Sequence, residues 1–162
     1  MKKTPLVIAT GFTSAYLGDE RSLIEFIVGD HVTKNIQSKG ENAVLYLIND
    51  SYDPLNERQL RVAVNKEEKL IKQFSKYCGQ PIAEIPDPFE CHASYAEHFV
   101  DALVQRLRSL SIYPVVMDAY KAYKSGLYAD YIKATFDNYE YVQNLLAERF
   151  DSYSMKNLFR AQ

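Results

Sequence analysis

The sequence predicts an α/β protein, a parallel sheet flanked by helices in a single compact domain, and three observations indicate this class. Short apolar runs at residues 5–10 and 43–48 have the composition of strands buried on both faces. A stretch of helical periodicity, residues 20–38, separates them. Strand, helix and strand in this order make a βαβ unit, so we expect parallel strands and a right-handed crossover.

The first helix carries its large apolar side chains at helical spacing, and we expect them to face the sheet. They are Leu23, Ile24, Ile27, Val28, Val32 and Ile36. The polar stretch 51–65 is expected to be a loop, and residues 66–77 a helix that ends before Gly79. An extended connection follows, because prolines recur at Pro81, Pro86 and Pro88.

The next helix has a clear start at a capping box, in which Ser94 and Glu97 each satisfy a free backbone N–H. Its buried face is expected to hold Phe99, Val100, Leu103, Val104, Leu107 and Leu110. Residues 113–118 predict a third strand, and helices are expected over residues 119–125 and 128–148. We therefore expect one domain over residues 1–150 and a tail over residues 151–162.

Composition limits the partners and the compartment. The chain has 162 residues and a formal net charge of −2, and no basic run exceeds two residues, which argues against a free-standing tRNA binder. The apolar run after Pro5 is too short to cross a membrane, and no signal peptide opens the sequence. We expect a cytoplasmic protein in which Cys78 and Cys91 are reduced thiols.

Four segments, in order along the chain, carry a family resemblance. They are Ala-Thr-Gly-Phe-Thr at 9–13, Asn-Asp-Ser-Tyr-Asp-Pro-Leu at 49–55, Ile-Pro-Asp-Pro-Phe at 85–89 with Cys-His-Ala-Ser-Tyr-Ala-Glu-His-Phe at 91–99, and Tyr-Lys-Ser-Gly-Leu-Tyr at 123–128. Together they resemble class I lysyl-tRNA synthetases over residues 5 to 148.

This resemblance implies a Rossmann-like (HUP-type) sheet that binds ATP and lysine at the carboxyl ends of its strands. The implied ligand is an adenine nucleotide such as ATP or AMP, an amino acid, or an aminoacyl-adenylate-like compound. No catalytic residue or firm cofactor is assigned. The candidate ligand-binding residues are Thr10, Gly11, Thr13, Tyr16, Gly18, Arg21, Asp50, Tyr52, Asp53, His92, Ser94 and Tyr95.

The turn after the first strand is shorter than in the family. If Gly18 is the signature glycine, Tyr16 stands where the family has a phosphate-binding histidine, whereas Arg21 keeps the family's arginine. Asp19 and Glu20 add negative charge where a triphosphate would bind, although acids favour a helix N-terminus. The segment is either a remodelled ligand site or, as we favour, a former motif that now caps the helix.

The family's second half of the sheet, its Lys-Met-Ser-Lys-Ser-type loop and its anticodon-binding domain have no counterpart in the sequence. We therefore expect a truncated relative that binds a small ligand without charging tRNA by itself. Two alternatives stay open. One is an enzyme that still forms an adenylate or transfers an acyl group, with or without a partner chain. The other is a protein-interaction module.

Two groups of polar residues have both a structural and a functional interpretation. Gly11 and Thr13 either line a small-molecule pocket or serve the turn alone. Asp50 and Asp53 could hold a ligand amine or a metal, but two acids in one loop are more often solvated or capping a turn.

Cys91, His92 and His98 suggest a zinc site or a Cys–His nucleophile. Their spacing fits no zinc pattern, and a fourth ligand is absent unless Cys78 contributes. Sequence neighbours also rarely face each other as a catalytic pair must. We therefore favour a role in capping the next helix and assign no metal.

The helices offer more apolar surface than a small sheet is expected to hide. The side chains concerned are Phe99, Leu103, Leu107, Tyr131, Tyr139, Val142 and Leu146. Tyrosine is enriched at interfaces, and the last segment is rich in it. We therefore predict a homodimer, or a complex with another chain, built on the last two helices.

Overall fold

The structure is a computed structural model, and it describes residues 4–18 and 20–149, with the backbone alone at residues 20 and 21. It forms two compact units, Met1–Lys121 and Ala122–Gln162. The first unit contains the sheet and both hydrophobic cores. The predicted tail, residues 151–162, lies outside the described residues, so the predicted domain boundary stays a prediction.

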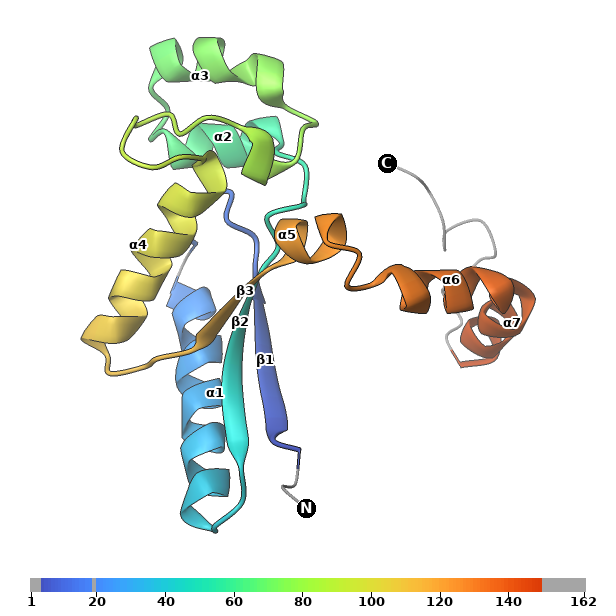
Figure 1. Cartoon of the computed structure of the whole chain (residues 1–162). Coiled ribbons are helices and arrows are strands. Elements are labelled where there is room, and N and C mark those ends of the chain that lie inside the picture. Colours follow the sequence, from blue (N-terminus) through green and yellow to red (C-terminus); the bar gives the residue numbers. More distant parts are fainter. Residues whose placement is uncertain (1–3, 19, 150–162) are drawn as a thin grey trace. The chain divides into compact units, whose positions relative to one another are not determined.

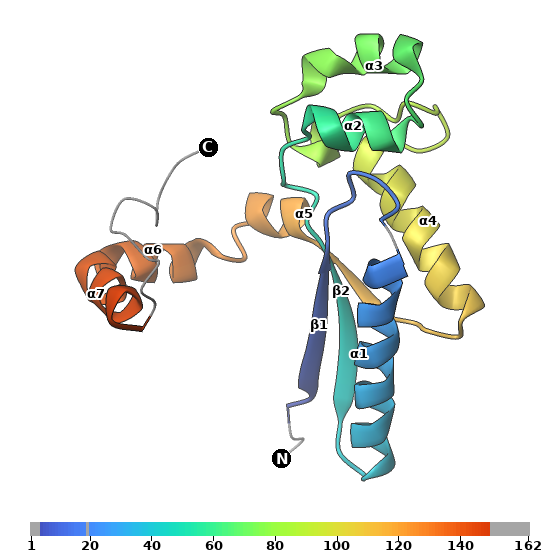
Figure 2. The same cartoon turned by 180° about the vertical axis from the view of Figure 1, so that it is seen from behind.

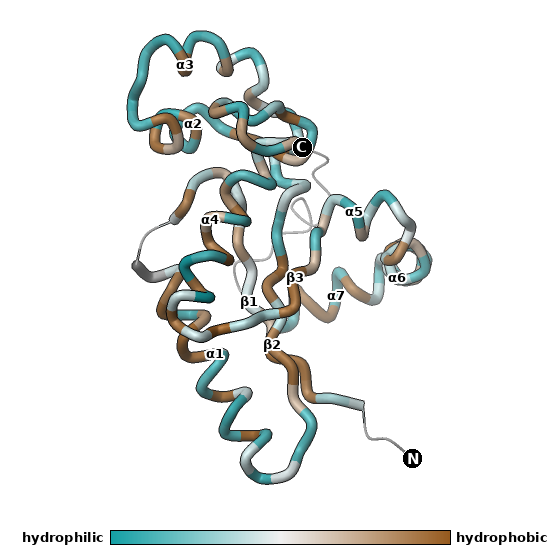
Figure 3. Tube along the Cα trace, turned by 60° about the vertical axis from the view of Figure 1, so that its left-hand side comes forward, coloured by the Kyte–Doolittle hydropathy of each residue, from teal (hydrophilic) through white to brown (hydrophobic). Residues whose placement is uncertain are grey.

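The sheet has three strands, β1 (Leu6–Phe12), β2 (Ala43–Asn49) and β3 (Val115–Asp118), in the order β1-β2-β3 (Figure 1). Both pairings are parallel, with Leu6 opposite Ala43 and Tyr46 opposite Val115. The predicted parallel α/β class is therefore confirmed. Hydrophobic residues are concentrated along these strands in Figure 3.

Helices α1 (Glu20–Ser38) and α4 (Tyr95–Ser109) lie on the same face of the sheet (Figures 1 and 2). Two right-handed crossovers that advance in one direction place their helices on one face. One hydrophobic core joins them, because Phe26 of α1 and Leu103 of α4 cluster with Leu47 of β2. This core holds α1 and α4 against the sheet, and it thereby fixes where the carboxyl ends of the strands lie relative to both helices.

Helix α1 meets the sheet with a different face from the predicted one. Phe26 is buried, and a Cβ added at Gly29 would lie only 2.9 Å from Cδ1 of Leu45. The glycine therefore permits a close approach between helix and strand. Because of this close approach, most of the apolar side chains that were predicted to face the sheet are exposed instead. Several of them line a groove of about 480 Å³ beside β1. The exposed members are Ile24, Ile27, Val28 and Val32.

The stretch between β2 and α4 lies beyond the carboxyl ends of the strands and contains α2 (Glu57–Ala63) and α3 (Glu68–Phe74) (Figure 1). Short 3₁₀ helices follow at Ser75–Tyr77 and Ile82–Glu84. The loop predicted over 51–65 is wrong, because a capping box starts α2. The Asn56 side chain accepts from the Gln59 N–H, and the Gln59 side chain accepts from the Asn56 N–H.

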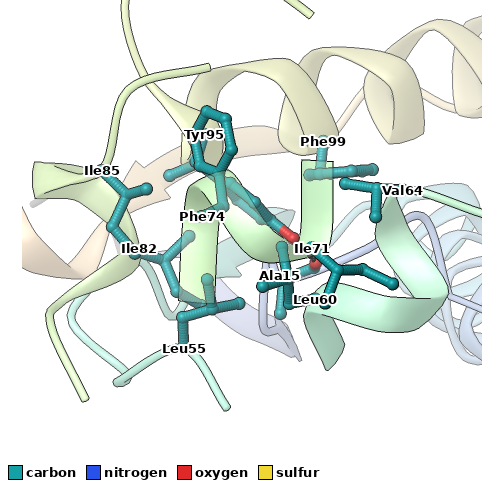
Figure 4. Close-up of a cluster of buried hydrophobic side chains, with 11 residues drawn as sticks. Ala15, Leu55, Leu60, Val64, Ile71, Phe74, Ile82, Ile85, Tyr95 and Phe99 are labelled. Carbon is teal, nitrogen blue, oxygen red and sulfur yellow. Dashed lines mark hydrogen bonds between the residues drawn. The ribbon is translucent and has the colours of Figure 1, made fainter. Parts of the chain in front are cut away.

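A second hydrophobic core holds this region against the start of α4 (Figure 4). The Ser94 half of the predicted capping box forms, since the Ser94 hydroxyl accepts from the N–H of Glu97 at 3.2 Å. The next residue, Tyr95, is fully buried, and its hydroxyl donates a 2.8 Å hydrogen bond to the carbonyl of Ala15. The start of α4 therefore supports the loop that follows β1.

Helix α5 (Ala119–Lys124) leads into the second unit, which contains α6 (Ala129–Asp137) and α7 (Tyr139–Arg149). The single helix predicted over 128–148 is wrong, because the chain breaks at Asn138, whose side chain caps the Ala134 carbonyl. Tyr131 is 75% exposed and Phe136 56% exposed. Large parts of these two rings therefore lie at the surface of the unit.

No helix in the described part of the chain is both long enough and apolar enough to span a membrane.

We predict that Tyr95→Phe lowers the free energy of unfolding by about 1–3 kcal/mol, because it leaves the buried Ala15 carbonyl without its donor. Urea denaturation with matched slopes measures this difference. Tyr77→Phe is the matched control, since the Tyr77 hydroxyl makes no hydrogen bond among the described residues. Equal losses in both variants would contradict the prediction.

Candidate functional site

The carboxyl ends of the three strands place Phe12, Asn49 and Asp118 at one edge of the sheet. Asp118 joins the strands, because its carboxylate accepts hydrogen bonds from the Asn49 amide at 3.4 Å and the Ser51 hydroxyl at 2.9 Å. The Ser51 hydroxyl in turn accepts from the backbone N–H of Tyr120. Parallel α/β sheets bind ligands outside this edge.

A hollow of about 320 Å³ opens beside this edge, between the loop after β1 and the start of α1. Four of the predicted site residues line this Gly11 hollow: Gly11, Thr13, Tyr16 and Gly18. Gly18 has a φ of 80°, and a Cβ there would lie 2.7 Å from the Ser22 hydroxyl. Glycine is therefore required for the chain to turn from the hollow into α1.

Four lining residues were missed by the sequence analysis: Phe12, Ser22, Glu25 and Gln59. Ser22 and Glu25 follow Gly18 at helical spacing, and this spacing was the available signal. Gln59 belongs to α2, a helix that the sequence reading had treated as a loop. The lining therefore combines the stretch from the end of β1 into α1 with one residue of α2 that is distant in sequence.

Two predicted carboxylates stand next to the hollow. The Thr13 hydroxyl donates to Asp53 at 3.0 Å, and a Cβ on Gly11 would lie 3.0 Å from an oxygen of Asp50. Burial of Asp50, together with the nearby charge of Asp53, raises the pKa of the Asp50 carboxyl. The structure therefore brings Asp50, Asp53, Gly11 and Thr13 together at this edge.

The remaining predicted residues whose side chains the structure describes do not line the hollow. Thr10 lines the apolar groove beside α1 instead, and the Tyr52 ring lies 5.6 Å from that of Tyr120. Ser94 and Tyr95 act from behind the loop, through the cap and the hydrogen bond to Ala15. The Arg21 side chain, like Asp19, lies outside the described residues.

A second cluster of polar side chains, which we call the Asp87 cluster, precedes α4 and consists of Asp87, Cys91, His92 and His98. One donor atom from each lies within 4.8 Å of all the others. The sequence had offered Cys78 as the fourth ligand of a Cys/His site, and the structure supplies Asp87 in that place. Asp87 was missed because a single aspartate in a turn carries no metal signature of its own.

Asp87 is the fixed point of this cluster. Its buried carboxylate accepts from the backbone N–H groups of Phe89, Cys91 and His92 at 2.8–3.0 Å. Burial alone would raise the pKa of Asp87, but these hydrogen bonds and one from the Cys91 thiol outweigh it and lower the pKa to about 2. A carboxylate held in this way is a ready anionic ligand.

Comparison with known proteins places the chain in a family. The family model "tRNA synthetases class I (K)" matches residues 1–159. The chain belongs to the class I lysyl-tRNA synthetase family. The lysine–tRNA ligase of Methanocaldococcus jannaschii is 35% identical over 148 residues, which are 90% of this chain and 26% of that protein.

Other curated relatives of this synthetase-family chain give the same picture. The lysine–tRNA ligase of Methanococcus maripaludis is 35% identical over 155 residues, 94% of this chain and 26% of the relative. That of Archaeoglobus fulgidus is 31% identical over 144 residues, 87% of this chain and 27% of the relative. The chain thus spans about a quarter of the length of these relatives, and the resemblance predicted from the four segments is confirmed.

The raised pKa of Asp50 predicts a pH-dependent effect of Asp50→Asn on stability. A raised pKa means that folding favours the protonated carboxyl, so wild type loses this contribution as pH rises through the folded pKa. We therefore expect Asp50→Asn to be more stable than wild type at pH 7. The difference should disappear as pH falls below the ordinary Asp pKa of about 3.9.

Thermal unfolding across this pH range measures the effect. Glu41→Gln, which removes the same charge at an exposed position, is the control and should show a smaller difference. A lower stability of Asp50→Asn at pH 7 would mean that the carboxylate is held by favourable contacts instead.

Proposed function

We propose that the chain binds an amino acid or an aminoacyl-adenylate-like ligand in the Gly11 hollow, without charging tRNA by itself. The observation that carries this proposal is the acidic character of the site. Glu25 lines the hollow, and Asp50 and Asp53 stand beside Gly11 and Thr13. Carboxylates suit a ligand ammonium group, which they bind by charge-assisted hydrogen bonds.

The charge also ranks the possible ligands. No lysine or arginine lines the hollow among the described residues; Arg58 lines a neighbouring hollow of about 210 Å³ that shares Tyr16 and Gln59. A lysyl adenylate carries two ammonium groups and one phosphate charge, so it suits this lining better than ATP, whose triphosphate would be repelled. AMP alone is intermediate.

Two buried polar atoms near the site support a ligand with several hydrogen-bonding groups. The Ser14 hydroxyl and the Asn49 side-chain oxygen are buried and have no hydrogen-bond partner among the described residues. Such atoms are rare in folded proteins and need an explanation. Ser14 follows the end of β1, and Asn49 is the last residue of β2, so both lie at the edge formed by the carboxyl ends of the strands. A bound water or ligand there would satisfy them.

We propose that the chain does not charge tRNA by itself because of the residues in the turn after β1. Tyr16 lines the hollow. If Gly18 is the family's signature glycine, Tyr16 replaces the phosphate-binding histidine, and a phenol brings no positive charge to a reacting phosphate. Loss of one well-placed charge-stabilising donor lowers a rate by about a hundred- to a thousandfold. The alternative is an enzyme that still forms an adenylate or transfers an acyl group, with or without a partner chain. In either case we place the protein in the cytoplasm, where Cys78 and Cys91 stay reduced.

A thermal-shift series tests the proposed ligand class. We expect a lysyl-sulfamoyl-adenosine analogue to stabilise the protein most, lysine and AMP less, and ATP least. At roughly 100 times its Kd, a ligand adds about 2.7 kcal/mol to stability. Thr13→Val, which removes the hydroxyl bonded to Asp53, should reduce the shift, whereas the isosteric Thr135→Val on α6 should not.

Two outcomes would change this conclusion. If none of the four compounds shifts the unfolding temperature, ligand binding is contradicted and a protein-interaction module is favoured. Lysine-dependent exchange of pyrophosphate into ATP would favour the adenylate-forming alternative, and lysyl-tRNA formed above a no-enzyme control would contradict the absence of charging.

Assembly is a second proposal, carried by the exposed aromatic side chains of α6 and α7. Phe99, Leu103 and Leu107 do not contribute as predicted, because all three are buried in the cores. Tyr131 and Tyr141 are exposed, however, as interface tyrosines would be in an isolated chain. We propose that a second copy of the chain, or another chain, packs on α6 and α7.

Light scattering behind a sizing column checks this proposal. A homodimer has twice the 18.6 kDa mass of the chain, and Tyr131→Glu should return it to the monomer. Ile24→Glu, at an equally apolar exposed position on α1, should leave the dimer intact. A dimer that Ile24→Glu disrupts and Tyr131→Glu leaves intact would indicate an interface on α1 and the edge strand β1. A monomer that persists when the protein is concentrated would exclude the homodimer.

A further inference from the structure

We propose that a second hollow, next to the Gly11 hollow, binds the carboxylate or phosphate of the same ligand whose ammonium groups the Gly11 hollow takes. This second hollow has a volume of about 210 Å³, and we call it the Arg58 hollow. It is lined by Tyr16, Asn56, Arg58, Gln59 and Val62. Binding of an anion there stands without the proposed function, whereas the assignment of that anion to the same ligand rests on it.

The capping box of α2 determines which polar atoms the Arg58 hollow offers. Oδ1 of Asn56 accepts from the Gln59 N–H at 2.9 Å, and Oε1 of Gln59 accepts from the Asn56 N–H at 3.0 Å. Both amide oxygens are therefore directed at the backbone. The amide nitrogens, Nδ2 of Asn56 and Nε2 of Gln59, have no acceptor among the described residues. Because amide nitrogens only donate hydrogen bonds, these two side chains contribute donors to the lining.

Arg58 adds a positive charge that its neighbours in α2 leave unbalanced. The adjacent carboxylate, Glu57, is bonded to Arg61 at 2.8 Å, and Arg61 also lies 3.5 Å from Glu68. Arg58 itself forms no ion pair with any described residue, and no described aspartate or glutamate lines the hollow. A guanidinium without a partner presents two parallel N–H donors, which match the oxygens of a carboxylate or a phosphate.

The two hollows have opposite charge and a common wall. Tyr16 and Gln59 line both of them. The Gly11 hollow contains the carboxylate of Glu25, whereas the Arg58 hollow contains a guanidinium and amide donors. A ligand that carries an ammonium group and, a short distance away, an anionic group therefore meets complementary charge at both positions. An amino acid and an aminoacyl adenylate both have this arrangement of charges.

The volume of the Arg58 hollow limits what it can hold. Sites that enclose a whole small ligand usually have about 300–1,000 Å³. A hollow of about 210 Å³ is smaller than this, so it suits one group of a ligand whose remainder lies elsewhere. A single arginine with neutral donors balances one negative charge, but not the several charges of a triphosphate. The Arg58 hollow therefore favours a carboxylate or a single phosphate over ATP.

Inorganic phosphate tests the anion site by itself. At constant ionic strength, phosphate in place of chloride should raise the unfolding temperature of the full chain, and Arg58→Gln should lose this shift. Arg58→Lys, which keeps the charge without the paired donors, should retain part of it. Arg108→Gln, at an exposed position on α4, is the control and should keep the full shift. The anion site is overturned if phosphate does not stabilise wild type, or stabilises wild type and Arg58→Gln equally.

Matched neutral compounds distinguish a carboxylate from a phosphate. Lysine and lysinamide differ in the carboxylate, and AMP and adenosine differ in the phosphate. Calorimetric titration of wild type should show tighter binding of the charged member, by about 10- to 100-fold, in the pair whose anion the hollow holds. Arg58→Gln should lose that preference. If Arg58→Gln keeps the preference of wild type in both pairs, the Arg58 hollow does not hold the anion of the ligand.

The lysyl-sulfamoyl-adenosine analogue tests whether one ligand occupies both hollows, because its acyl sulfamate is an anion in the place of the phosphate. Its affinity should fall at least about tenfold in Arg58→Gln and stay unchanged in Arg108→Gln. Equal affinity for wild type and Arg58→Gln would overturn the shared ligand but leave the proposed function. If wild type binds none of the compounds and still shows the Arg58-dependent phosphate shift, the proposed function fails while the anion site stands.

Discussion

The hydrogen bond from the Tyr95 hydroxyl to the Ala15 carbonyl joins two segments that are 80 residues apart in sequence. The loop after β1 leaves the sheet and lacks ladder hydrogen bonds of its own, so it needs support from elsewhere. Tyr95 supplies this support from the base of α4, within a core that also contains Ala15 and Phe99. The position of the loop after β1 therefore depends on where α4 begins. The Ser94 cap and the turn before it fix this start.

The edge formed by the carboxyl ends of the strands contains charged and buried polar groups whose arrangement costs stability. Two carboxylates lie close enough for Asp53 to raise the pKa of Asp50, and the Ser14 hydroxyl is buried without a partner among the described residues. Gly11 leaves room for the Asp50 carboxylate that a side chain would fill. Each of these features costs stability, and stability is commonly given up where a ligand must be bound.

Sequence alone predicted the parts of the fold whose signals are local. The apolar runs of β1 and β2 and the cap at Ser94 all depend on near neighbours in sequence. The face of α1 was mispredicted because Gly29 packs closely only when Leu45 of β2 is opposite, and a single sequence does not show that contact. Asp87 was missed for a similar reason, since its meaning depends on backbone N–H groups and side chains that only the folded turn brings together.

The two polar clusters of the protein differ in what they leave open, and this difference assigns their roles. In the Asp87 cluster, one donor atom from each of the four residues lies within 4.8 Å of the others, and the Asp87 side chain is buried. The Gly11 hollow instead leaves Glu25 facing a space of about 320 Å³, with the Asp53 carboxylate behind the Thr13 hydroxyl. The hollow therefore offers room for the proposed ligand. Tyr95 lies between His92 and His98 in sequence, and its hydroxyl donates to the Ala15 carbonyl in the loop after β1, so one buried side chain connects the two regions.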